Sequence, residues 1–62
     1  MLKGLAEELW AIYKHQPVWD GDVISKQQRD ELVRQGLVWR KNGYNMLTLK
    51  GRRLIEPEGG AG

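Results

Sequence analysis

The chain has 62 residues, a formal net charge of +2 and no cysteine, so it is long enough for one small domain but cannot form disulfides or a cysteine-ligated zinc site. No apolar run approaches the ~20 residues that span a bilayer, so we expect a cytoplasmic protein without a membrane partner. The small positive charge permits nucleic-acid binding without requiring it.

Apolar side chains recur at helical spacing near the start of the chain. The stripe consists of Leu2, Leu5, Leu9 and Ile12. This spacing predicts a helix over residues 2–15 that packs its apolar side on the core. Pro17 ends the helix, because the residue before a proline avoids helical angles. The Asp and Gly residues in the stretch 18–22 are typical of a turn, so we expect a turn there.

A second helix is predicted over residues 25–35. Ser25 is a favourable N-cap, and Gly36 is a favourable residue just beyond the C-terminal end. The helix has few apolar residues, mainly Leu32 and Val33. We therefore expect one narrow side of it to pack while the rest stays exposed.

Residues 37–47 carry a strong hairpin signal, because Asn42-Gly43 stands between two short apolar runs. Asn-Gly readily adopts the positive φ angles of a type I′ turn. With these two residues as the loop, the turn fixes the register of the strands. The expected pairs are Lys41 with Tyr44, Arg40 with Asn45, Trp39 with Met46 and Val38 with Leu47.

Alternation along the two strands gives the hairpin two different faces. One face carries Trp39, Lys41, Tyr44 and Met46, and the other carries Val38, Arg40, Asn45 and Leu47. If Val38, Leu47 and Leu49 point inward, the face with Trp39 becomes an exposed apolar strip. If that face packs inward instead, Trp39 joins the core and Arg40 lies outside. The sequence leaves both arrangements open.

Thr48 is positioned to cap a short final helix over residues 48–55, which Pro57 ends. The tail at 57–62 is Gly-rich and polar, so we expect it to be disordered. The predicted fold is a single α+β domain over residues 1–56, with helices at about 2–15, 25–35 and 48–55 and a two-stranded hairpin at 37–47.

The order of these elements resembles the winged helix-turn-helix family. The resemblance rests on Gly36-Leu37-Val38, the turn Asn42-Gly43 and Leu47-Thr48-Leu49-Lys50-Gly51-Arg52. It implies a small winged-helix domain of bacterial or phage type that binds double-stranded DNA as a regulator, and a homodimer would present two half-sites. Only residues 16–24 separate the first two helices, so either a single turn at 20–24 stands in for the family's middle helix or the fold is a pared-down variant.

The resemblance also implies which residues contact DNA, through the helix from Lys26 and through the hairpin as the wing. These are Lys26, Gln27, Arg29 and Arg34 in the helix, Arg40, Lys41, Asn42 and Asn45 in the hairpin, and Arg52 and Arg53 beyond it. Lys and Arg neutralise phosphates, whereas Gln and Asn read adenine edges. Asp30 and Glu31 support a second interpretation, in which the helix only presents a solvated face with internal ion pairs.

Trp39, Tyr44 and Met46 suggest an alternative function. As an exposed strip they would anchor a protein partner, and the chain would be a protein-interaction or assembly module. For the other tryptophans, Trp10 and Trp19, core filling is the commoner role. The sequence pairs no nucleophile with a base and contains no phosphate loop or metal-ligand spacing, so we expect no enzyme activity, cofactor or metal.

Overall fold

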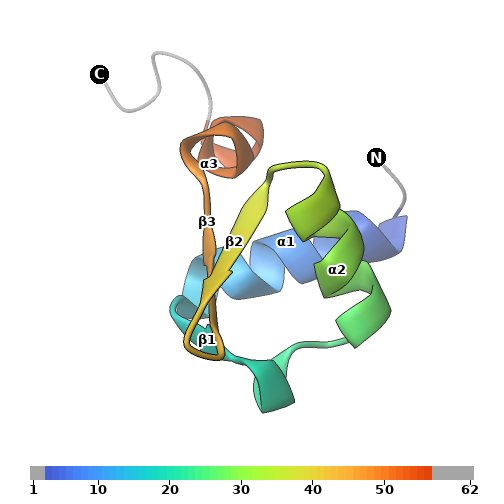
Figure 1. The fold of residues 1–62 in the computed structure, drawn as a ribbon. Coiled ribbons are helices and arrows are strands. Elements are labelled where there is room, and N and C mark those ends of the chain that lie inside the picture. Colours follow the sequence, from blue (N-terminus) through green and yellow to red (C-terminus); the bar gives the residue numbers. More distant parts are fainter. Residues whose placement is uncertain (1–2, 57–62) are drawn as a thin grey trace.

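The computed structural model describes residues 3–56 and shows a small α+β domain (Figure 1). Its elements in chain order are α1 (Lys3–His15), β1 (Val18–Trp19), the 3-10 helix η1 (Asp20–Asp22), α2 (Lys26–Arg34), β2 (Val38–Lys41), β3 (Tyr44–Leu47) and α3 (Leu49–Ile55). The three predicted helices and the hairpin are confirmed within these bounds. Two predictions fall outside the described residues: the first two positions of the first helix and the tail at 57–62.

The hairpin has the predicted turn and register. Asn42 and Gly43 both have positive φ angles, of 54° and 82°, as a type I′ turn requires. The pairs are Val38 with Leu47, Trp39 with Met46, Arg40 with Asn45 and Lys41 with Tyr44. The turn chemistry therefore fixed the faces of both strands.

The sheet contains a third strand that the sequence did not predict. Residues 18 and 19 were expected in a turn, but β1 pairs with β3, with Val18 opposite Asn45 and Trp19 opposite Tyr44. The resulting antiparallel sheet has the order β1-β3-β2, and with the helices it forms a winged-helix-like topology. Two residues are too few to show an alternating pattern, so β1 depends on tertiary pairing.

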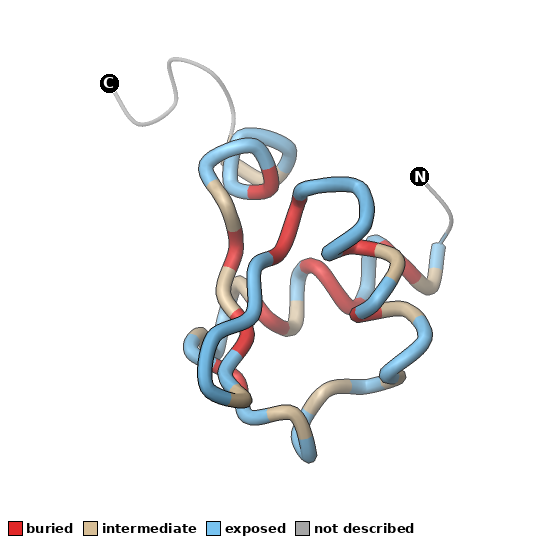
Figure 2. Tube along the Cα trace, viewed as in Figure 1, coloured by how far each residue is buried: buried red, intermediate tan, exposed pale blue. Residues whose placement is uncertain are grey.

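The core lies between the inner face of the sheet and the helices α1 and α2, as the buried segments in Figure 2 show. Its buried apolar members are Leu5, Leu9, Ile12, Val18, Leu32, Leu37, Val38 and Leu47. Of the two arrangements that the sequence left open, Val38 and Leu47 therefore follow the one in which they point inward, but Leu49, which was grouped with them, is 63% exposed. Trp10 and Trp19 are not core residues either, since each is 49% exposed.

Side-chain caps define where the helices begin. The Ser25 hydroxyl accepts a hydrogen bond from the Gln28 backbone N–H at 3.4 Å, and the Thr48 hydroxyl accepts one from the Gly51 N–H at 3.0 Å. The buried Glu8 carboxylate of α1 accepts the backbone N–H groups of Ile24 and Ser25, at 3.0 and 2.7 Å. Glu8 thus attaches the start of α2 to α1, a contact that the sequence did not reveal.

Candidate nucleic-acid interface

A polar cluster centred on Asp20 connects the short helix η1 to both α2 and the hairpin. Its carboxylate accepts hydrogen bonds from Arg29 Nη1 at 2.7 Å, from Asn45 Nδ2 at 2.9 Å, and from both Nε (2.9 Å) and Nη2 of Arg40. We call Asp20, Arg29, Arg40 and Asn45 the Asp20 network. One carboxylate therefore joins three elements that are distant in the sequence.

Two members of the Asp20 network are buried. Asn45 is fully buried and also donates to the Val18 carbonyl at 3.0 Å, and it accepts from Arg29 Nη1 at 3.2 Å. Arg29 is 8% exposed and donates a further bond to Asp30 at 2.7 Å. The expectation that Arg29 and Asn45 contact DNA is therefore wrong for this fold, because both side chains point inward and are used there.

Three other arginines proposed as DNA contacts lie on the surface but already have acidic partners. Arg40 pairs with Asp20, Arg34 pairs with Glu31 in α2, and Arg52 lies 3.6 Å from the Glu56 carboxylate. Arg52 and its neighbour Arg53 belong to α3, which follows the end of β3 remote from the hairpin turn (Figure 1). The structure therefore does not bring the two α3 arginines together with the other candidates.

Four further predicted contacts are exposed, in two groups that come from α2 and from the hairpin. Lys26 and Gln27 occupy the first turn of α2, and Lys41 and Asn42 form the hairpin tip. Within residues 3–56 neither lysine forms an ion pair. In Figure 1 the start of α2 and the hairpin tip both lie toward the same end of the molecule, on either side of η1. They are the part of the predicted DNA surface that the fold leaves available.

The acid–base behaviour of Asp20 reflects its arginine partners. Hydrogen bonds from Arg40, and then from Asn45 and Arg29, hold the pKa of the Asp20 carboxyl well below its usual range. Arg34 and Gln35 likewise lower the pKa of Glu31 to about 2. A carboxylate with a lowered folded-state pKa stabilises the protein above its unfolded pKa, because at lower pH the unfolded chain takes up the proton first.

Asp20 should therefore make the protein sensitive to acid. We expect the unfolding temperature to be steady at neutral pH and to fall as the pH drops below about 4, the unfolded value. The Asp20→Asn variant should be less stable at neutral pH and show a flatter acid dependence. Glu31→Gln, which removes an exposed pair, should flatten it less. Thermal unfolding of the three proteins across pH measures this, and equal slopes for wild type and Asp20→Asn would contradict it.

The outer face of the sheet carries most of the exposed aromatic surface. Because Val38 and Leu47 point inward, the predicted strip of Trp39, Tyr44 and Met46 lies outside, with Trp39 42% and Tyr44 44% exposed and Met46 half-buried. We call the set of Trp19, Trp39, Lys41, Tyr44 and Met46 on this face the aromatic face. The sequence did not predict that Trp19 belongs to this face, because it did not predict the strand β1.

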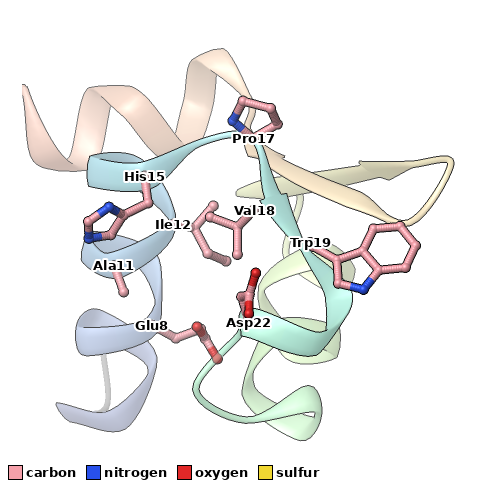
Figure 3. A pocket seen from close by; sticks show the side chains of 8 residues that line it. All are labelled: Glu8, Ala11, Ile12, His15, Pro17, Val18, Trp19 and Asp22. Atoms are coloured by element: carbon pink, nitrogen blue, oxygen red, sulfur yellow. The ribbon is translucent and has the colours of Figure 1, made fainter.

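A pocket of about 300 Å³ lies between α1 and the β1–η1 segment (Figure 3). It is lined by Glu8, Ala11, Ile12, His15, Pro17, Val18, Trp19 and Asp22. The carboxylate of its buried acid, Glu8, already accepts hydrogen bonds from two backbone N–H groups. His15 lines the pocket from α1 and Asp22 lines it from η1. The polar side chains that line the pocket do not include a nucleophile paired with a base.

The chain was compared with protein-family models, curated proteins and solved structures, and none of them matched. Within residues 3–56 no helix has the length and apolarity needed to cross a membrane. The same residues contain no group of three or more His, Asp or Glu side chains arranged to hold a metal ion.

Proposed function

We propose that this protein is a small DNA-binding regulator of the winged-helix type that acts in the cytoplasm. It binds double-stranded DNA through the first turn of α2 and the hairpin tip. The observation that carries the proposal is the Asp20 network, which ties the hairpin to α2 and leaves Lys26, Gln27, Lys41 and Asn42 exposed around it. The winged-helix-like topology supports the same assignment.

The four exposed residues suit two different tasks at a duplex. Lys26 and Lys41 neutralise phosphates and fix the position of the protein, whereas Gln27 and Asn42 offer amide groups that can pair with adenine edges. The N-terminal end of α2 adds the positive end of a helix dipole. With only two free lysines in this surface, a monomer binds weakly and a dimer with two half-sites would bind more tightly.

Salt dependence of duplex binding tests this proposal. We expect binding at ~50 mM salt that weakens steeply as salt rises, because each lysine–phosphate contact releases a counterion. Lys26→Ala and Lys41→Ala should each lower the slope of log K against log salt by about 1. Fluorescence anisotropy with a labelled duplex provides the measurement.

Lys14→Ala is the matched control, since Lys14 is an exposed lysine at the end of α1, outside the proposed surface. It should leave the slope and the affinity unchanged. The proposal fails if the wild type does not bind a duplex at ~50 mM salt, or if Lys14→Ala weakens binding as much as Lys26→Ala does.

A further inference from the structure

The aromatic face is chemically unlike the rest of the surface. The three strands contain two cations, Arg40 and Lys41, and no acidic residue. Arg40 belongs to the other face of β2, where its half-exposed side chain pairs with Asp20, so Lys41 is the charged residue of the aromatic face. The face therefore combines three half-exposed aromatic rings with a single positive charge and lies on the opposite side of the sheet from α2.

Two of its rings are held in place by local packing. Trp19 and Tyr44 meet edge to face, with ring centroids 5.1 Å apart and planes inclined by 62°. The Trp19 ring also lies over Gly43, where an added Cβ would come within 2.4 Å of it. Since these rings are already ordered while nearly half exposed, stacking another flat group on them costs little conformational entropy.

From these features we propose that the aromatic face binds single-stranded nucleic acid by stacking bases on Trp19, Trp39 and Tyr44. Exposed aromatic rings on an open sheet stack bases of any sequence, and a nearby cation contacts the backbone phosphate. Here Lys41 lies opposite Tyr44 in the hairpin register and supplies that cation. This site is separate from the proposed duplex surface, apart from Lys41 at their shared edge.

The size of the face favours bases over a protein partner. A standard protein interface buries roughly 800 Å² on each side, which is nearly a fifth of the 4405 Å² accessible surface of this chain. Three half-exposed aromatic side chains expose only about 300 Å². The three rings alone therefore do not make up a protein interface of standard size, whereas each stacked base needs only one ring.

Three tryptophan variants test the proposal. Trp19→Leu and Trp39→Leu keep an apolar side chain but remove the aromatic ring, and Trp10→Leu is the matched control. Trp10 is 49% exposed, as Trp19 is, but it lies beside a groove between α1 and α3. With a short oligothymidylate as the probe, we expect binding to quench the tryptophan fluorescence of the wild type. Each face variant should bind the probe with a roughly 5- to 150-fold lower affinity. The control should bind as wild type.

Two further measurements distinguish single-strand binding by the aromatic face from duplex binding by α2 and the hairpin tip. In the wild type, the indole N–H signals of Trp19 and Trp39 should shift on adding the oligonucleotide while that of Trp10 does not. Duplex binding should survive in both face variants, and Lys26→Ala should weaken duplex but not single-strand binding. Absence of single-strand binding at ~50 mM salt, or equal binding by the face variants, overturns the proposal. Self-association of the wild type that Trp39→Leu abolishes also overturns it, in favour of a protein-binding face.

Discussion

Replacing Gly51 with alanine is expected to lower the free energy of unfolding by about 3 kcal/mol. A Cβ at this position would lie 2.1 Å from the Leu37 carbonyl oxygen and 3.0 Å from its carbon. That oxygen also accepts the Thr48 N–H at 3.0 Å, so it cannot move without disturbing the start of α3. A chain of 62 residues has a total stability of roughly 3–9 kcal/mol. Thermal or urea unfolding followed by circular dichroism should therefore show a large loss.

Gly4→Ala is the matched control for this substitution, because Gly4 is also helical but meets a flexible neighbour. Its added Cβ would approach the far end of the Gln28 side chain, at 2.2 Å from Nε2, and that amide can swing away. Alanine also favours the helix by up to about 1 kcal/mol over glycine. We expect Gly4→Ala to match or exceed the wild type. If Gly51→Ala were as stable as the wild type, the close contact between α3 and the Leu37 backbone would be wrong.

Local chemistry explains why so much of the fold could be predicted from the sequence. Asn42-Gly43 dictates a turn and therefore a register, and Ser25 and Thr48 each provide a cap that needs only the next three residues. Gly36 has a φ angle of 77°, as a residue just beyond a helix often does. Each of these signals operates within a few positions of the chain, which is the range over which a single sequence can be interpreted.

The candidate site was predicted less well, because its geometry depends on contacts between distant residues. Nothing in the sequence near Asp20 indicates that Arg40, twenty positions away, pairs with it. Arginine and asparagine are typical of DNA-contacting surfaces, but they are equally suited to buried polar networks. Residue type alone therefore could not separate Lys26 and Lys41, which stay free, from Arg29 and Asn45, which are enclosed.

The Asp20 network also has a consequence for the proposed function. A small domain with a thin core has little apolar packing to fix a hairpin relative to a helix. Hydrogen bonds from Arg29 in α2 and from Arg40 in β2 to one carboxylate impose that geometry directly. Duplex recognition by two separate elements requires such a fixed spacing, because a displaced hairpin tip would lose its phosphate contacts.

Replacing Asn45 with leucine removes the buried centre of this arrangement and should lower the free energy of unfolding by about 3 kcal/mol. The Val18 carbonyl would lose the Asn45 donor at 3.0 Å, and Arg29 would lose an acceptor at 3.2 Å. Leaving these groups unsatisfied inside the protein is costly, although leucine is similar in size to asparagine. Urea unfolding of the variant measures the change.

Met46→Leu is the control, because it alters the neighbouring position on the outer side of β3 with little change in volume. It should cost less than about 1.5 kcal/mol. An Asn45→Leu variant as stable as the wild type would mean that apolar packing can replace the polar centre, as happens when some buried ionic groups are exchanged for apolar residues. In that case the spacing of α2 and the hairpin would depend on the core residues Val38 and Leu47 rather than on the Asp20 network, and duplex binding by Asn45→Leu should equal that of the wild type.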